Sequence, residues 1–304
     1  MYFPYFRGRQ YELLALKELV NKQLLSEKVI PVIEPIKISS TFISTLQVFS
    51  DNNLKLGLVL NPQVGELVKE PLSLLLKFIS DVVIPSVIFN SDAYDFIQSL
   101  DENGINKERI LAILDNADYI ASYKDVFTEV SPLYTLTTDE RNFRRSISQN
   151  KVLFKDYFVK QQKNADYEKK NDEPFSEDHK YYNDEGFVGF GDYSIIGNNY
   201  EEGGFSPRAV AIHIVYFDKA SSLRIHHFVS DSNYGTEDVA GKYYEAVNKL
   251  KQWFCSDYEK QKTLALSILL EHADNGYYPG LPTIKKLSIM HHLELMSRYL
   301  EGKI

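Results

Sequence analysis

The stretch KLGLVLNPQVGELVKEPLSLLLKFISDVVIPSVIFN (Lys55–Asn90) places two short apolar runs on either side of a helical segment. The first run, KLGLVLNP (Lys55–Pro62), and the last, VIPSVIFN (Val83–Asn90), have the length and composition of buried strands. The segment PLSLLLKFIS between them has the apolar spacing of a helix. Two such strands around a helix are typical of parallel pairing with both faces of the sheet covered. This stretch therefore predicts an α/β fold.

The same alternation of strand and helix recurs outward from this stretch over the first two thirds of the chain. Eight such units favour a TIM-barrel-like (β/α)8 fold over an open doubly wound sheet. No GxGxxG follows a first strand and no GxxxxGK[ST] occurs, which disfavours a dinucleotide-binding fold and a P-loop. The expected strands are Tyr2–Phe6, Val29–Pro35, Lys55–Pro62, Val83–Asn90, Arg109–Asn116, Ser131–Asp139, Lys151–Phe158 and Phe187–Ile196.

The remainder of the chain predicts additions to this barrel. The long polar segment Lys160–Gly186 lies between the last two strands, and a loop of this size is either functional or disordered. Ala209–Asp218 and Leu223–Asp231 are expected to pair as a β-hairpin, and three helices follow. We expect a barrel domain over residues 1–235 that includes the hairpin at 209–231. A helical segment over 236–304 is expected to pack on it.

Composition and charge restrict the class of protein. The chain has 304 residues and a formal net charge of −8, whereas general binders of the nucleic-acid backbone carry a basic excess. The one cysteine, Cys255, excludes an internal disulfide and is expected to pack within a helix. The first residues, MYFPYFRGRQ, lack a signal-peptide pattern, and no apolar run has membrane-spanning length. We therefore expect a soluble cytoplasmic protein.

Carboxylates at the ends of the expected strands are the candidate catalytic groups, because TIM barrels place their sites at the carboxyl ends of the strands. Glu34 lies between two prolines in VIPVIEP, and glutamate is not a favoured turn former. Asp115 ends the apolar run ILAILD, where low-dielectric surroundings would raise the pKa of its carboxyl towards the range of a general acid or base. Asp192 ends the eighth strand within a glycine-rich and aromatic block.

A second set of residues at the same rim is expected to bind a ligand. Arg7 and Lys37 would supply positive charge for an anionic group such as a phosphate or a carboxylate. His213 would join them if the hairpin covers the barrel mouth. For each single asparagine or aspartate the alternative is a helix cap or a turn. The expected ligand-binding residues are Arg7, Arg9, Lys37, Asn61, Asn90, Lys155, Asp156, Tyr193 and His213.

The sequence contains no metal or cofactor motif. Glu177, Asp178 and His179 are consecutive, so they cannot all point easily at one ion, and no HExxH spacing occurs. No GxSxG elbow is present either. The sequence therefore predicts no metal site and leaves the cofactor unknown.

Several separated motifs resemble the phage-type beta-protein family and an uncharacterised bacterial branch of it. YFPYFRGRQYELLALKEL resembles the start of that family, where a basic residue, Gly, a basic residue and Gln follow the first strand. VIPVIEPIK, QQKNADY, FSEDHKYY and GFGDYSIIG…GGFSPRAVAIH are similar to the motifs of the bacterial branch, and the resemblance runs from Tyr2 to Asp231. It implies a TIM-barrel-like fold and a phage-defence or mobile-element setting, but no reaction.

Two functions remain open at this point. The first is an enzyme or sensor with a phosphorylated or nucleotide-type ligand at the barrel rim. The second is a non-catalytic component of a defence complex, which binds a protein partner encoded nearby through its tyrosine-rich loop and C-terminal helices.

Overall fold

The computed structural model describes residues 1–201, 203, 207–254 and 256–304. Cys255, expected in a helix, and Gly204, in the glycine-rich block, lie outside the described residues. Contacts within the chain define two compact units. The first comprises Met1–Leu13, Glu27–Asp156 and Asp178–Tyr193, and the second comprises Leu14–Ser26, Tyr157–Glu177 and Ser194–Ile304.

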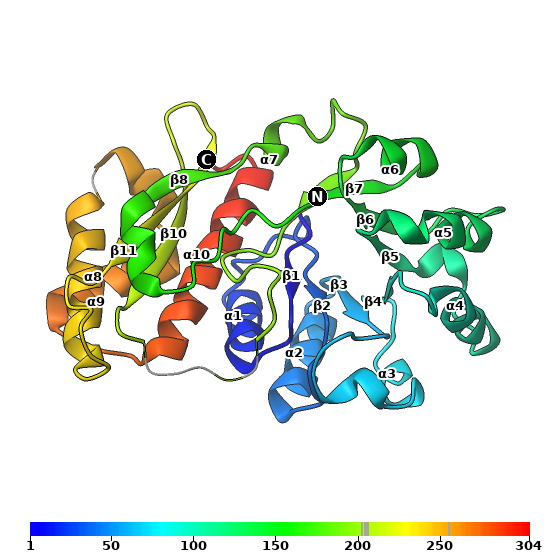
Figure 1. Ribbon diagram of the computed structural model, residues 1–304, viewed down its shortest axis with the longest axis horizontal. Helices are drawn as coiled ribbons and strands as arrows, with labels where there is room; N and C mark the ends of the chain where they lie inside the picture. The colour runs from blue at the N-terminus through cyan, green and yellow to red at the C-terminus, as the bar shows by residue number, and fades with distance from the viewer. Residues whose placement is uncertain (202, 204–206, 255) are drawn as a thin grey trace. The chain divides into compact units, whose positions relative to one another are not determined.

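The first unit is built on a parallel sheet whose eight strands follow one another in chain order. Helices α2 to α6 cover the outside of these strands (Figure 1). The TIM-barrel-like α/β fold predicted from the sequence is therefore confirmed. The strands are β1 (Tyr5–Phe6), β2 (Val32–Ile33), β3 (Leu56–Val59), β4 (Val83–Ile88), β5 (Leu111–Leu114), β6 (Tyr134–Thr137), β7 (Lys151–Phe154) and β9 (Gly189–Gly191).

Backbone hydrogen bonds close this sheet on itself. The N–H of Phe3 donates to the carbonyl of Phe190 at 2.8 Å, and the N–H of Tyr5 donates to that of Asp192 at 2.8 Å. Gly191 permits this approach, since a Cβ there would lie 2.3 Å from the carbonyl oxygen of Phe3. Strand β9 therefore lies directly beside the start of the chain.

The helices of the first unit are short and bury apolar stripes against the strands. Helix α2 begins after Ser39, whose hydroxyl accepts from the N–H of Phe42 at 3.1 Å. Phe42, Leu46 and Phe49 recur at helical spacing and are buried. The helices are α1 (Gln10–Asn21), which continues into the second unit, α2 (Ser40–Asp51), α3 (Ser73–Leu76), α4 (Ala93–Glu102), α5 (Ile120–Val126), α6 (Arg141–Ser146) and α7 (Asp178–Tyr181). Short 3-10 segments are η1 (Glu66–Lys69), η2 (Lys107–Arg109) and η3 (Ala117–Tyr119).

The second unit contains an antiparallel sheet in the order β10-β11-β8. The expected hairpin is present as β10 (Ala211–Phe217) and β11 (Leu223–Val229). Strand β8 (Asp172–Ser176) lies in the segment expected to be a long polar loop, which also contains the 3-10 segment η4 (Asn164–Lys170). Because β8 pairs with β11, this segment is a part of the sheet. Contacts group the hairpin with the C-terminal helices, and the domain division expected at residue 235 stays a prediction.

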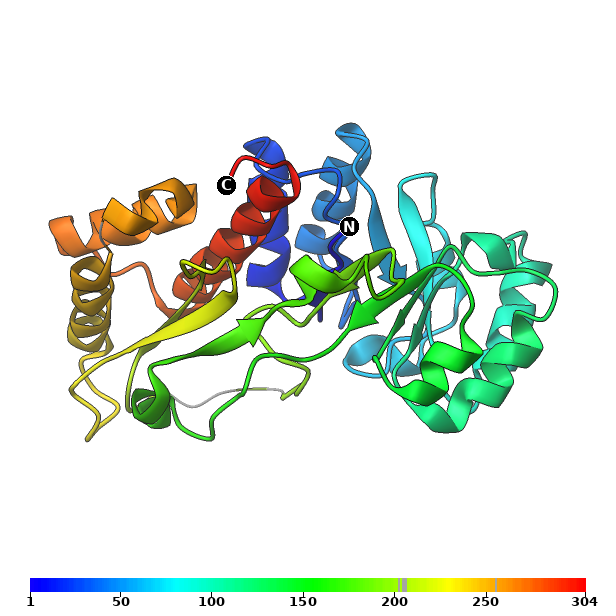
Figure 2. The ribbon, with the colours of Figure 1, turned by 90° about the horizontal axis from the view of Figure 1, so that it is seen from above.

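Helices cover both faces of this second sheet. Helix α8 (Val239–Trp253) lies on one face and α10 (Leu281–Leu300) on the other (Figure 1). Helix α9 (Leu264–Asn275) packs beside α8 (Figure 2), and η5 (Ser256–Gln261) lies between them in the chain. Helix α10 is buried over most of its length, histidines included. In the described part of the chain, no helix combines the length and apolarity needed to cross a membrane.

Candidate functional site

The carboxyl ends of the barrel strands hold a buried polar cluster centred on Glu34. This side chain directly follows β2 and is fully buried. Its carboxylate accepts from the hydroxyl of Tyr5 at 2.8 Å, from the backbone N–H of Gln63 at 2.6 Å and from the guanidinium of Arg7. A buried carboxylate with three donors is well satisfied, so Glu34 fixes the positions of the groups around it.

Aromatic rings hold Arg7 from the other side. Its guanidinium carbon lies 5.3 Å from the ring centroid of Tyr5 and 5.8 Å from that of Tyr193, within the range of a cation–π contact. The rings of Tyr5 and Tyr193 are 5.1 Å apart, and Phe154 at the end of β7 lies 4.9 Å from Tyr193. Arg7 is therefore fixed between an anion and an aromatic wall.

Two further carboxylates act on this wall electrostatically. Burial raises the pKa of the Tyr193 phenol, and the charges of Asp115 and Asp156 raise it further, while Arg7 opposes them. Burial likewise raises the pKa of Tyr5, with Asp115 again contributing. Both phenols are therefore neutral hydrogen-bonding groups at physiological pH.

The structure thus brings together residues that follow four neighbouring strands, β7, β9, β1 and β2, and one residue that follows β5 across the barrel. Arg7, Glu34, Asp115, Asp156 and Tyr193 form this rim cluster, and their expected role in a site stays a prediction. Asp115 is exposed, so the low-dielectric surroundings expected for it are absent. Arg9 is half-buried, and its backbone N–H donates to the carboxylate of Glu12 in α1. Lys37 and Lys155 are exposed beside the ends of β2 and β7.

The two predicted asparagines have structural partners. The side chain of Asn61 donates to the carbonyl of Ile88 at 2.8 Å and accepts from its N–H at 2.9 Å, so it extends the pairing of β3 with β4. Asn90 accepts from the N–H of Asp92 at the start of α4. Asn90 therefore fits the cap-and-turn alternative that the sequence left open, whereas Asn61 joins two strands.

Two other predicted residues have partners outside the rim cluster. Asp192 is buried and accepts from the hydroxyl of Tyr2 at 2.7 Å. Since side chains alternate along a strand, Asp192 faces the side opposite to Tyr193. His213 belongs to β10 in the second unit, where its Nδ1 lies 2.7 Å from the Nδ1 of His227.

Sequence reasoning missed two contributors to the rim. Tyr5 lies two residues before Arg7, and the period of a strand places both on one face. Thr138 directly follows β6, and among the described residues its buried Oγ1 has no hydrogen-bond partner. Counting back two residues from Arg7 would have found Tyr5.

No metal centre is formed by the described residues, since no group of three or more His, Cys, Asp or Glu side chains is arranged to hold an ion. Comparisons of the chain with protein-family models, curated proteins and solved structures found no match. The function therefore has to be argued from the geometry of the rim cluster.

Proposed function

We propose that the barrel binds a phosphorylated or nucleotide-type ligand at the rim formed by Arg7, Glu34, Asp115, Asp156 and Tyr193. The observation that carries this proposal is the buried hydrogen-bonded group of Tyr5, Arg7 and Glu34 at the carboxyl ends of a closed barrel. Burying charged groups is costly unless they are paired, and barrels concentrate such groups at their sites. The same arrangement at a purely structural position would gain little stability over apolar packing.

The mixed chemistry of the rim matches the three parts of a nucleotide-type molecule. Carboxylates such as Asp115 and Asp156 accept hydrogen bonds from sugar hydroxyls. The aromatic edge of Tyr193 suits a planar base, and the nearby cations Lys37 and Lys155 suit a phosphate. Glu34, with its three donors, acts as an anchor, which leaves the exposed Asp115 as the better candidate for proton transfer. The proposal includes both a sensor and an enzyme, within the defence setting that the resemblance implies.

Calorimetric titration with nucleoside mono-, di- and triphosphates and with sugar phosphates tests this function. Replacing the exposed or half-buried carboxylates, Asp115→Asn and Asp156→Asn, should weaken the binding of the active compound about tenfold, the loss of one hydrogen bond to a charged group. Tm should stay within about 2 °C of wild type. Asp101→Asn is the matched control, because it removes an exposed carboxylate near the C-terminal end of α4, the end remote from the carboxyl end of β4.

Two results would contradict the proposal. One is that no compound of the panel binds to the wild-type chain. The other is that both rim variants bind as tightly as the Asp101→Asn control.

A second candidate function is a protein-interaction role for the second unit. Tyr234 is 95% exposed and Tyr277 is 58% exposed, and exposed tyrosines are enriched where proteins bind one another. Co-purification with the products of neighbouring genes tests this role. The double variant Tyr234→Ala/Tyr277→Ala should lose the partner, while Asp115→Asn should retain it.

A further inference from the structure

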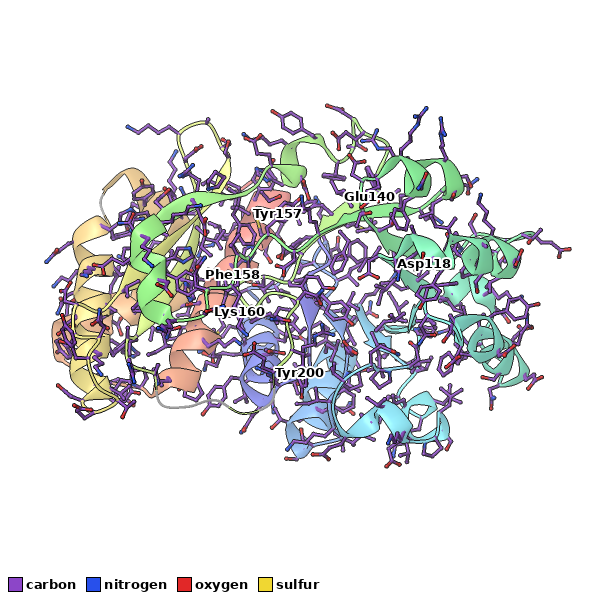
Figure 3. The ribbon with its side chains drawn as sticks, in the orientation of Figure 1. Asp118, Glu140, Tyr157, Phe158, Lys160 and Tyr200 are labelled. Carbon is purple, nitrogen blue, oxygen red and sulfur yellow. The ribbon has the colours of Figure 1, made fainter. Side chains whose placement is uncertain are left out.

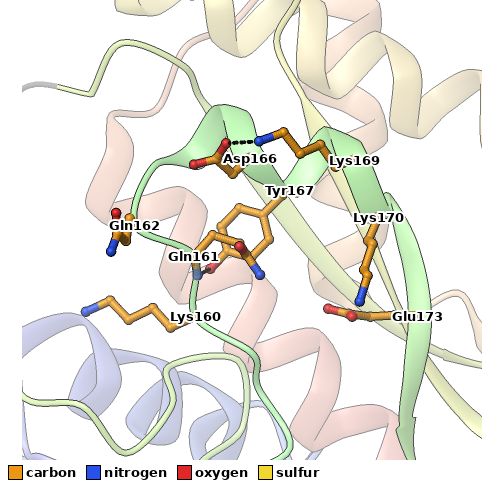
Figure 4. Close-up of a pocket in the computed structure, with 8 residues that line it drawn as sticks. All are labelled: Lys160, Gln161, Gln162, Asp166, Tyr167, Lys169, Lys170 and Glu173. Atoms are coloured by element: carbon orange, nitrogen blue, oxygen red, sulfur yellow. Dashed lines mark hydrogen bonds and ion pairs between the residues drawn. The ribbon is translucent and has the colours of Figure 1, made fainter.

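The second unit contains a pocket of about 470 Å³ between η4, β8 and the residues that precede η4. Figure 4 shows its side chains, and Figure 3 places Lys160 just after Phe158 on the segment that leads into it. All of them belong to the second unit, so the pocket is independent of the barrel rim. The pocket is lined by Lys160, Gln161, Gln162, Asp166, Tyr167, Lys169, Lys170 and Glu173.

The lining of this pocket is positively charged on an otherwise acidic protein. Three lysines face two carboxylates here, although the whole chain has a net charge of −8. A pocket of about 450 Å³ on the barrel offers the contrast, since one lysine, Lys107, faces Asp101, Glu108, Asp125 and Glu129 there. Cavities of nearly equal size thus present opposite charge, and only the first suits an anion.

The lysines are available to a ligand. Lys169 pairs with Asp166 at 2.7 Å and Lys160 with Glu201 at 3.0 Å, but both pairs are solvent-exposed and therefore weak. Among the described residues, Lys170 forms no hydrogen bond or ion pair, and its amine points towards Glu173 (Figure 4). Lys170 is therefore the cation best placed to bind an incoming anion.

A chain of hydrogen bonds leads from Glu173 into the interior. The Glu173 carboxylate lies 3.2 Å from Nε2 of His227, and Nδ1 of His227 lies 2.7 Å from Nδ1 of His213. The ring of Tyr167 covers both imidazoles, at 4.7 Å from each centroid. The Glu173–His227–His213 chain thus begins at the pocket wall.

The hydrogen bonds determine which nitrogen atoms of this chain carry a proton. Beside a carboxylate, Nε2 of His227 has to be the donor, so Nδ1 of neutral His227 is an acceptor. Nδ1 of His213 therefore carries the proton between the two rings, and Nε2 of His213 holds the free lone pair. A proton taken up at that nitrogen breaks no hydrogen bond in the chain and reduces its charge from −1 to zero.

Several charged groups surround the two histidines. Burial lowers the pKa of His213, and His227 and Lys285 of α10 lower it further. Burial also lowers the pKa of His227, while Glu173 and Asp172 of β8 oppose the effect and His226 adds to it. Both rings are therefore neutral at physiological pH, and the chain takes up its proton only in acid.

We propose that this pocket binds a small oxyanion of the phosphate or sulfate type at Lys170, and that proton uptake by the Glu173–His227–His213 chain strengthens the binding. The anion would lie beside the negative charge of Glu173, which repels it. Addition of one proton to the chain removes this repulsion. Affinity should therefore rise as the pH falls.

Sulfate is the best probe, because it remains dianionic across the range in which histidine titrates. Calorimetry or NMR titration at constant ionic strength, from about pH 7.5 down to the lowest pH at which the second unit stays folded, should show binding by wild type that tightens as the pH falls well below about 6.5. Lys170→Met should weaken binding about fivefold at every pH. Lys107→Met, in the acidic pocket on the barrel, should bind sulfate as wild type does.

Two variants of the chain test its role. Glu173→Gln removes the repelling charge, so it should bind sulfate more tightly than wild type at about pH 7.5. His213→Gln removes the nitrogen that takes up the proton, so it should lose the pH dependence. The fluorescence of Trp253 in the same unit reports whether each variant is folded. A nucleoside monophosphate that binds more tightly than sulfate and also depends on Lys170 would identify a phosphate ester as the source of the oxyanion; equal binding would identify the free anion.

The proposal is overturned if wild type binds no sulfate at either pH, or if Lys170→Met binds it unchanged. It is also overturned if binding by wild type does not depend on pH, if Glu173→Gln binds sulfate no more tightly than wild type at about pH 7.5, or if His213→Gln keeps the pH dependence of wild type. Asp115→Asn at the barrel rim should leave sulfate binding unaltered. The experiments can therefore reject one proposed site without rejecting the other.

Discussion

The barrel and the second unit use buried polar side chains in different ways. In the barrel, strands follow one another in chain order and each delivers polar groups to a common rim, where Glu34 anchors Arg7 and Tyr5. In the second unit, the sheet joins distant segments, and buried histidines pair with neighbours inside the unit. His291, for example, lies between the hydroxyl of Thr263 and the carbonyl of Val215, each at 2.7 Å. Polar groups at the rim are those for which we propose a ligand, whereas those inside the second unit should make its stability depend on pH.

Removal of the Glu34 anchor should give the largest effect on stability. Glu34→Ala leaves Arg7, whose side chain is 12% exposed, without its buried anion, and it deprives Tyr5 and Gln63 of an acceptor. We expect a loss of about 4 kcal/mol in the free energy of unfolding, as for other broken buried ion pairs. Urea unfolding followed by circular dichroism measures it. Glu66→Ala, which removes an exposed glutamate nearby in η1, should cost less than about 0.5 kcal/mol, and equal losses in the two variants would refute the anchoring role.

The difference between the units also explains what the sequence could predict. Each barrel strand is a local apolar run followed by a helix, so seven short patterns after the first were enough to indicate the closed sheet. The rim followed because parallel strands end at the same edge. Hairpin β10–β11 was equally local, with four residues between its expected strands.

Local sequence patterns could not predict the features that depend on pairing between segments distant in the chain. Strand β8 has the sequence DEPFS, with two acids and an exposed Pro174, so its composition argues against a strand. Only its pairing with β11, about fifty residues later in the chain, makes it one. The same holds for Asp192, whose partner Tyr2 is distant in sequence. Spacing alone could not show that Asp192 pairs with Tyr2.

The two units should also differ in how their stability changes at acidic pH. We expect the second unit to lose more of its free energy of unfolding than the barrel does. Burial lowers the pKa of His291 to about 4 and that of His292 to about 3. Below the unfolded value of about 6.5, the unfolded chain takes up protons that the native unit refuses, so stability falls as the pH falls. Between about pH 7 and about pH 5 each histidine should cost about 2 kcal/mol.

Fluorescence of the one tryptophan, Trp253, follows the second unit selectively during urea unfolding at each pH. The free energy of unfolding of the second unit should depend less on pH in His291→Leu than in wild type. The difference should be about 2 kcal/mol between about pH 7 and about pH 5, the contribution of one histidine. An unchanged dependence would show that His291 is protonated, or solvated, in the native unit.

The smallest effect is expected at Ser194, the first residue of the second unit after the barrel strand β9. Its backbone has a positive φ of 49°, which favours glycine, while its buried hydroxyl lies 3.0 Å from Nδ1 of His292. Ser194→Ala keeps the strained backbone and loses the hydroxyl, so it should destabilise the second unit by about 1 kcal/mol. Ser194→Gly loses the same contact but relieves about 1 kcal/mol of strain, which should leave it closer to wild type than the alanine variant. Unfolding monitored through Trp253 ranks the two; if glycine proves the more damaging, unfolded-state entropy outweighs the strain.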